Sequence, residues 1–168
     1  PISFEKQGVR AMIADCIGVS VSEDDEYLED WRKMADRVDE FQEEVRIAMV
    51  GKYTGLSDSY LSVIKALQHS SIAVNRRLVI DWIESTDLDS SITGTDRDAH
   101  REAWETLKLA DGILVPGGFG NRGVEGKIEA ARYARESRVP YLGICLGLQI
   151  ATIAVSYTHL TLPTILLV

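Results

Sequence analysis

The sequence is poor in the residues that mark secreted, membrane and metal-binding proteins. Its 168 residues include only two cysteines, too few for a disulfide framework, and its three histidines show no zinc-ligand spacing with them. No run of about 18 or more apolar residues is present to span a bilayer. No basic segment followed by an apolar one opens the chain as a secretion signal would. These absences predict a cytoplasmic protein with no structural metal and no membrane partner.

Positive charge is also scarce. The chain has 18 lysines and arginines against 26 aspartates and glutamates, which gives a formal net charge of −8. Such a chain is poorly suited to the phosphate backbone, so we expect no nucleic-acid partner. A hydrophobic content of 45% and a charged content of 26% are typical of a folded domain, and the length suffices for one core.

The first part of the chain differs from the rest. Residues 1–21 are mixed in character, whereas residues 22–44 are strongly charged and predict an amphipathic helix that Ser22 would cap. This helix either connects two domains by packing on a partner surface or is simply solvated, and the sequence supports both equally. Its apolar residues recur at steps of three and four: Leu28, Trp31, Ala35, Val38 and Phe41.

Beyond residue 44 the pattern alternates between strands and helices. This order predicts an α/β fold with an open, mainly parallel sheet flanked by helices. In such a sheet function lies at the carboxyl ends of the strands, here the loops 51–57, 116–123 and 143–147. We expect strands at 45–50, 77–84, 112–115 and 140–144, a polar loop at 85–98, and helices at 57–73, 99–109, 124–137 and from 146 onward.

The clearest chemical signal is the string Gly143-Ile144-Cys145-Leu146-Gly147, hereafter the elbow. It matches a nucleophile elbow, in which a tight strand-to-helix turn projects the nucleophile from the sheet edge. Glycines on both sides let the backbone pass close to itself, and the helix N-terminus favours a thiolate. A buried core cysteine is the alternative, but the flanking glycines favour a nucleophile.

Two further loops carry weaker signals. Glycines 117 and 118 follow a strand and could present backbone amides to a developing oxyanion, although Pro-Gly alone is a common turn. Gly51-Lys52-Tyr53-Thr54-Gly55 could approach a phosphate, but it is no Walker A loop, and by itself Lys52 is expected to be a solvated lysine.

Several strings together resemble one family, the glutamine amidotransferase domain of the CTP synthases. They include residues 47–53, 57–60, 63–67, 114–126 and 141–149, and the likeness covers about residues 24–155. The resemblance implies a flavodoxin-like class I amidotransferase fold that is incomplete at its C-terminus. It also divides the chain into the end of a synthetase domain at 1–21, an acidic linker helix at 22–44, two-thirds of the amidotransferase domain at 45–155, and an atypical tail at 156–168.

The resemblance also implies residue roles. Cys145 would attack the glutamine side-chain amide, and Gly118 and Leu146 would donate amides to the oxyanion hole. Glutamine would be bound by Gly118, Phe119, Leu146, Gly147 and Gln149. The GTP contacts and lid of the family would fall on Lys52, Tyr53, Phe119, Arg122, Gly123 and Glu125.

The implied reaction supplies ammonia for the ATP-dependent amination of UTP to CTP. The parent enzyme would use ATP and Mg²⁺, with GTP as activator, and this part of it would bind no cofactor. Implied partners are glutamine, the synthetase domain of the same parent chain, and three further copies in a homo-tetramer.

The sequence departs from the family near its end. The family's catalytic histidine and glutamate match no residue here, and only 23 residues follow Cys145. Residues 156–163, with Pro163 and two threonines, predict irregular structure rather than a continued helix. We therefore expect the chain alone to hydrolyse glutamine poorly. Because the chain opens on Pro1, we expect it to begin inside a longer protein. Another cysteine hydrolase of related fold and a non-catalytic nucleotide-binding module remain open alternatives.

Overall fold

The predicted parallel α/β architecture is confirmed in a computed structural model that describes residues 2–20, 26–52, 57–90, 97–118 and 120–159. The strands are β1 (Glu44–Gly51), β2 (Arg77–Glu84), β3 (Gly112–Val115) and β4 (Tyr141–Gly143). They form one sheet in the order β2-β1-β3-β4, and every neighbouring pair is parallel. The helices are α1 (Ile2–Lys6), α2 (Val9–Ile17), α3 (Glu26–Glu40), α4 (Leu61–Ala73), α5 (Arg97–Lys108), α6 (Val124–Ser137) and α7 (Leu146–His159), with short 3₁₀ turns at Ser57–Tyr60 and Ser85–Leu88.

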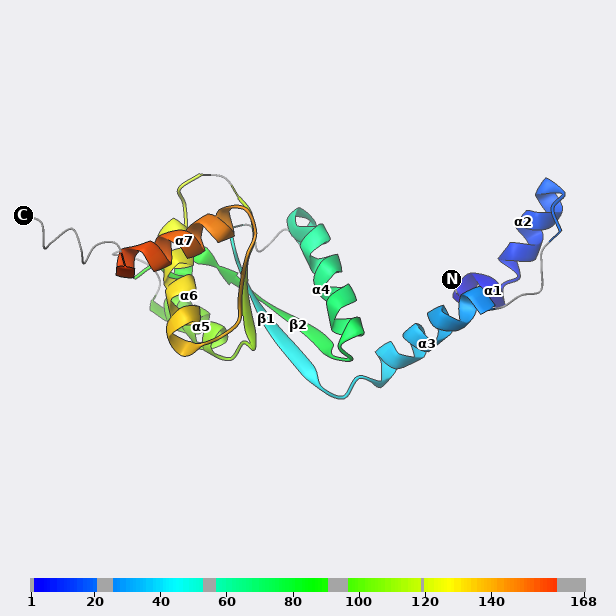
Figure 1. Cartoon of the computed structure of the whole chain (residues 1–168), viewed down its shortest axis with the longest axis horizontal. Coiled ribbons are helices and arrows are strands. Elements are labelled where there is room, and N and C mark those ends of the chain that lie inside the picture. Colours follow the sequence, from blue (N-terminus) through cyan, green and yellow to red (C-terminus); the bar gives the residue numbers. More distant parts are fainter. Residues whose placement is uncertain (1, 21–25, 53–56, 91–96, 119, 160–168) are drawn as a thin grey trace, which may run out of the picture.

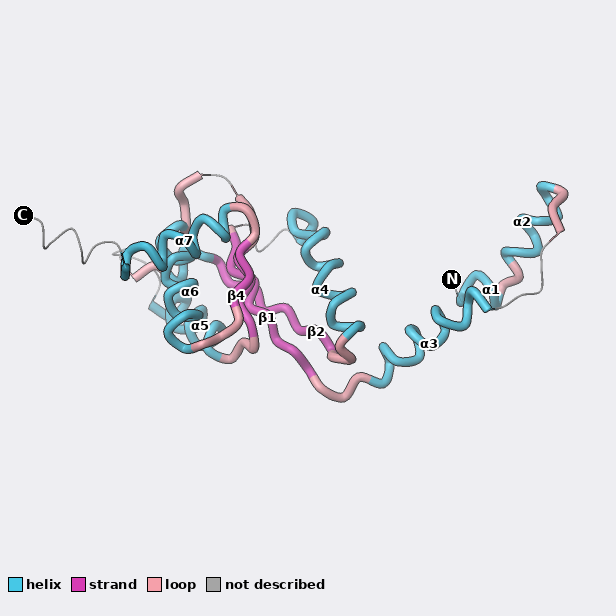
Figure 2. The backbone as a smooth tube through the Cα atoms, in the orientation of Figure 1, coloured by secondary structure: helices cyan, strands magenta, loops and turns pink. Residues whose placement is uncertain are grey.

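Helices cover both faces of this sheet. Figure 1 shows α4 on one side and α5, α6 and α7 on the other, and Figure 2 shows the strands between these two layers. The apolar pattern explains the arrangement, because β3 is buried at all four positions and its neighbour β1 is buried over its last four residues. A central strand buried on both faces needs a helical layer on each.

The main core lies between the sheet and helices α5 and α6. Leu107 and Val115 are fully buried there, and Ala130 and Ala134 let α6 approach the strands closely. A second cluster joins α6 to α7 through Ile128, Ala131, Ile150 and Ala154. Burying a leucine or isoleucine side chain stabilises the fold by roughly 1.5–3 kcal/mol, so these contacts hold α7 and the turn that precedes it in place.

Several predicted elements match the structure closely, namely the strands at 77–84 and 112–115 and the helix at 124–137. The prediction for residues 57–73 is divided between a 3₁₀ turn and α4. The acidic helix is shorter than predicted, because α3 ends at Glu40 and β1 already begins at Glu44. The proposed cap at Ser22 lies outside the described residues, as do residues 53–56 of the first predicted functional loop.

The prediction that the last helix breaks at residue 156 is wrong. Helix α7 continues through Ser156 to His159. Ile150 and Ala154 anchor this helix on α6, and serine and threonine cost only a fraction of a kcal/mol in a helix that is already packed. Pro163, the residue that would break the helix, lies outside the described residues.

The N-terminal helices extend away from the sheet (Figure 1). The apolar side of α3 is mostly uncovered, with Trp31 50% and Val38 41% exposed. An open groove of about 560 Å³ lies between α3 and α4, lined by Asp30, Trp31, Lys33, Met34, Arg37, His69, Ile72 and Ala73. Within the described residues, no helix is long and apolar enough to cross a membrane.

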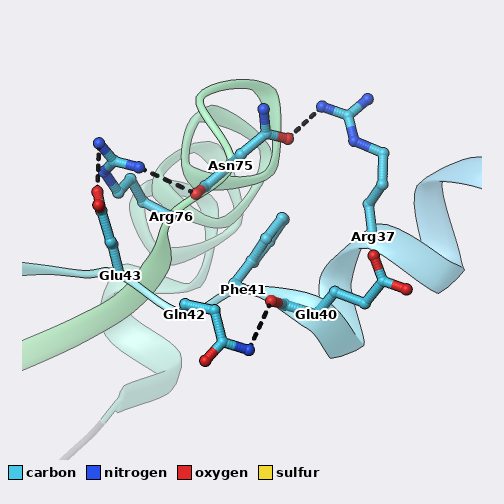
Figure 3. Close-up of a pocket in the computed structure, with 7 residues that line it drawn as sticks. All are labelled: Arg37, Glu40, Phe41, Gln42, Glu43, Asn75 and Arg76. Carbon is cyan, nitrogen blue, oxygen red and sulfur yellow. Dashed lines mark hydrogen bonds and ion pairs between the residues drawn. The ribbon is translucent and has the colours of Figure 1, made fainter.

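A polar junction joins the end of α3 to the turn between α4 and β2 (Figure 3). Arg37 donates a hydrogen bond to the side-chain oxygen of Asn75, and Arg76 forms an ion pair with Glu43 at 2.6 Å. These side chains are exposed around a pocket of about 370 Å³, so their pairing is screened by solvent. The junction orients α3 by polar contacts rather than by a core.

Candidate active site

The elbow forms a strained turn between β4 and α7. Cys145 has a φ of 55°, in the left-handed region that residues with a side chain rarely adopt. Two backbone bonds hold this conformation: the Ile144 amide donates to the Val115 carbonyl at 3.0 Å, and the Leu148 amide donates to the Cys145 carbonyl at 3.1 Å. The Cys145 side chain is exposed, which contradicts the alternative of a buried core cysteine.

Close backbone approach explains both glycines of the elbow. A β-carbon on Gly143 would lie 2.4 Å from the carbonyl group of Gly147, and one on Gly147 would lie 2.0 Å from the Val115 oxygen. Any side chain at either position would collide with backbone rather than with a flexible side chain. The glycines are therefore required by the path of the chain between β3 and α7.

The loop after β3, residues 116–123 and hereafter the glycine loop, lies beside this cysteine. A β-carbon on Gly117 would lie 3.3 Å from the Cys145 β-carbon and 3.8 Å from its sulfur. Gly118 follows directly, and the space around its own β-carbon position is open to 4 Å. The Leu146 amide is the first of the 14-residue helix α7, where helix amides lack an intrahelical acceptor. The start of the glycine loop and the N-terminus of α7 thus both lie next to Cys145.

The other predicted glutamine-binding residues occupy different environments. Gly147 is buried, while Gln149 is exposed on the first turn of α7 and its amide donates to the Cys145 carbonyl at 3.2 Å. Phe119 lies outside the described residues, as does Tyr53, which was predicted to contact GTP rather than glutamine. The predicted roles of these four residues stay predictions.

The structure adds Tyr141, which the sequence analysis missed. Its hydroxyl donates a hydrogen bond to the Gly147 carbonyl at 2.9 Å, so β4 is tied to the first turn of α7. Burial raises the pKa of Tyr141 from 10.0 to about 12. A tyrosine that opens a strand gives no sequence signal for such a contact.

The described residues that were predicted to contact GTP lie in the glycine loop or next to it. Lys52 is only 4% exposed, so the expectation of a solvated lysine is wrong, and its ammonium donates to the Gly120 carbonyl at 2.6 Å. Arg122 donates to the Lys52 carbonyl at 2.9 Å and lies 3.3 Å from a Glu84 carboxylate oxygen. Gly123 is half-buried and Glu125 is exposed. GTP contact at these residues stays a prediction.

A second buried lysine lies in the same cluster and was also missed. Lys127 on α6 is 1% exposed. Burial lowers the pKa of its ammonium, the neighbouring Lys52 lowers it further, and Glu84 opposes both effects. Its place in a charged string at the start of a helix gives no sequence signal for burial, which results from the docking of α6 on the sheet.

No metal centre is apparent in the part of the chain that the structure describes. No group of three or more histidine, cysteine, aspartate or glutamate side chains gathers there. The two cysteines are unpaired, with Cys16 exposed on α2 and Cys145 exposed at the elbow.

This geometry defines a class: α/β domains that present an exposed elbow cysteine at the carboxyl edge of a parallel sheet. A family model narrows the class. The model of the glutamine amidotransferase class-I family matches residues 55–161, and the chain belongs to this family.

The chain is similar to CTP synthases among curated proteins. It is 56% identical over 126 residues to the CTP synthase of Eremothecium gossypii, a match that covers 75% of this chain and 22% of the relative. It is 46% identical over 154 residues to CTP synthase 2 of Xenopus laevis, which covers 91% of this chain and 27% of the relative. The chain thus spans about a quarter of the length of these relatives.

A solved structure shows the same likeness. The glutaminase domain of Trypanosoma brucei CTPS with bound acivicin is 45% identical, with a TM-score of 0.58. The match covers 67% of this chain and 40% of that one. At this identity the likeness extends beyond the fold to the sequence of the domain.

Proposed function

We propose that the chain is the glutamine-hydrolysing part of a CTP synthase, which supplies ammonia for the ATP-dependent amination of UTP. The observation that carries this proposal is the exposed, strained Cys145 beside the glycine loop, where a β-carbon on Gly117 would lie 3.8 Å from its sulfur. The similarity to CTP synthases, which includes a domain solved with acivicin, supports the same reaction.

The reaction begins when the Cys145 sulfur attacks the side-chain amide carbon of glutamine. The oxygen of the tetrahedral intermediate accepts hydrogen bonds from the amides of Gly118 and Leu146, which are held in place before the reaction starts. The carbon–nitrogen bond then breaks, and ammonia leaves with a proton from a general acid. Water hydrolyses the glutamyl thioester, which releases glutamate and restores the thiol. The resemblance assigns the proton transfers to a histidine oriented by a glutamate, and neither matches a residue of this sequence.

The remaining parts of the proposal follow from the same likeness. Glutamine contacts Gly118, Phe119, Leu146, Gly147 and Gln149. The ammonia passes to a synthetase domain that uses ATP and Mg²⁺, GTP activates the hydrolysis, and the full protein is a cytoplasmic homo-tetramer. The family match over residues 55–161 and the similarity of residues outside it to the Xenopus relative support a link between two domains.

Replacing Cys145 tests the proposal in the full-length protein that the gene encodes. Cys145→Ser should lower glutamate release from glutamine by at least about 100-fold, because the nucleophile is lost. Cys16→Ser is the matched control, since it removes the other exposed thiol from a helix remote from the elbow. Its rate should remain near that of the unchanged protein.

Labelling separates this function from the alternatives. A glutamine-mimicking electrophile such as acivicin should label Cys145, and free glutamine should block the labelling. Labelling that glutamine does not block would indicate another cysteine hydrolase. GTP binding with an unreactive Cys145 would indicate a nucleotide-binding module, and either result would overturn the proposal.

A further inference from the structure

The proposed reaction uses Cys145 and two backbone amides, yet two lysines are buried close to the glycine loop. Burying an ammonium group lowers the stability of the folded state unless the charge is paired. A buried lysine therefore indicates a role other than packing. Lys52 follows β1 and is 4% exposed, and Lys127 lies on α6 at 1% exposed. The Lys52 ammonium reaches the glycine loop through a side-chain hydrogen bond, whereas Lys127 bonds to Gly123 through its backbone amide, a bond that does not depend on its side chain.

The glycine loop is fixed at several points along its length. At its start, the Val115 carbonyl accepts the Ile144 amide, and Gly117 lies against Cys145. At its end, Gly123 has a φ of 71° and packs so closely on Ser85 that a β-carbon there would lie 2.1 Å from the serine oxygen. The middle of the loop, which carries Gly118, depends on a different contact.

That contact comes from Lys52. Its ammonium donates to the Gly120 carbonyl at 2.6 Å, two residues beyond Gly118. A charge-assisted bond of this length in a buried site is among the stronger hydrogen bonds in proteins. Gly120 has a φ of 81°, so the loop turns sharply where the lysine holds it.

Arg122 also contacts Lys52 and the end of β2. It donates to the Lys52 carbonyl at 2.9 Å and pairs with Glu84 at 3.3 Å, so the loop and the residue that holds it are linked twice. The ends of β1, β2 and β3 are joined in this way at one edge of the sheet. The hydrogen bond from Lys52 fixes the glycine loop and not the thiol, because the elbow is held separately by its bond to β3.

We propose that Lys52 is a positioning residue for amide hydrolysis: its bond to the Gly120 carbonyl holds the glycine loop so that the Gly118 amide faces the oxyanion formed at Cys145. The inference rests on the function proposed above and deepens it. Lys52 touches neither the substrate nor the sulfur in this role. It acts through the loop.

The test compares Lys52→Met with Lys127→Met in the full natural protein. Both exchanges remove one buried ammonium from the same cluster and keep a long apolar chain, so their general effects on folding are matched. Three quantities are measured: kcat and KM for glutamine hydrolysis, the rate of Cys145 alkylation by iodoacetamide, and hydrogen exchange in a peptide that covers residues 116–123.

For Lys52→Met we expect kcat to fall by about 10- to 100-fold, because loss of an oxyanion-hole donor typically costs 10²–10³-fold and the loop is displaced rather than removed. KM should change less than kcat. Alkylation should stay within about twofold, since the thiol is held by the elbow rather than by Lys52. Loop amides should exchange faster, and Lys127→Met should resemble the unchanged protein in all three measurements.

Several results would overturn the proposal. These are an unchanged kcat or unchanged loop exchange in Lys52→Met, or an equal loss of hydrolysis in both lysine variants. A parallel fall of hydrolysis and alkylation would also overturn it, because it would show a general effect on the fold. If the unchanged protein releases no glutamate, the proposed function fails, while the exchange measurement still decides whether Lys52 holds the loop.

Discussion

The elbow region and the N-terminal helices both contain glycines, but the structure requires them for different reasons. At Gly143 and Gly147 a β-carbon would lie within 2.4 Å of backbone atoms, so space is the constraint. At Gly8 and Gly18 nothing lies within 4 Å, and the constraint is the positive φ at each end of α2. A crowded glycine fixes one tertiary arrangement, whereas an open one fixes only a local turn.

The same contrast holds for amphipathic helices. Helix α6 buries Ala130 and Ala134 against the sheet, whereas α3 leaves Trp31 and Val38 substantially exposed. Both sequences show an apolar face at helical spacing. A helical pattern therefore predicts a face that can be buried, but only neighbouring elements bury it.

The largest expected effect comes from the core under α5. Leu107→Ala should lower the free energy of unfolding by about 2–5 kcal/mol, because Leu107 is fully buried and its loss leaves a cavity. Trp31→Ala, the matched exchange on the exposed side of α3, should stay within about 0.5 kcal/mol. Urea unfolding measures both, and similar losses would show that α3 packs on a surface in solution.

The next effect concerns crowding at the elbow. Gly147→Ala should destabilise the domain by about 1–3 kcal/mol or more, because the new β-carbon meets the Val115 oxygen at 2.0 Å. Gly118→Ala is the control for stability, since its β-carbon would enter open space. Thermal unfolding compares them, and a neutral Gly147→Ala would mean that the β3–elbow contact is loose.

Tyr141→Phe should lower the free energy of unfolding by about 1 kcal/mol, because the hydrogen bond to the Gly147 carbonyl is lost.

This contribution of Tyr141 should depend on pH. Burial raises the pKa of Tyr141 from 10.0 to about 12, so the folded state keeps the phenol proton at pH values where the unfolded state has lost it. The unfolded chain then binds fewer protons, and this contribution to stability is complete below pH 10 and is lost as the pH rises through about 12. Comparing unfolding of both proteins from pH 9 to 12 should show their difference shrink, and a constant difference would contradict this account.

The smallest effect is expected at the junction of Figure 3. Arg37→Ala removes the bond to Asn75, but both side chains are exposed, so stability should change by about 0.5 kcal/mol or less. Chemical denaturation checks this. A loss above about 1 kcal/mol would show that the junction couples α3 to the sheet and would weaken the contrast between the two regions.

The architecture could be predicted from the sequence because the local sequence patterns agree with the fold. The strand at 112–115 and the helix at 124–137 were bounded correctly, since an apolar run ends at Pro116 and a helical period starts beyond the glycine loop. The elbow was also predictable, because its glycines and cysteine lie close together along the chain. The end of α7 was not, because packing of Ile150 and Ala154 on α6 outweighs the weak helix propensity of residues 156–159.

The sequence by itself determined where a nucleophile would stand: a cysteine between two glycines, after a strand and before a helix. Only the tertiary structure decided what lies around it, namely the bond from Tyr141 to the Gly147 carbonyl, the bond from Lys52 to the Gly120 carbonyl and the burial of Lys127 on α6. The physical reason is the distance along the chain over which each effect acts. Backbone conformation and apolar period act over a few neighbouring residues, whereas the contacts of Lys52 come from Gly120 and Arg122, which lie 68 and 70 residues further along the chain.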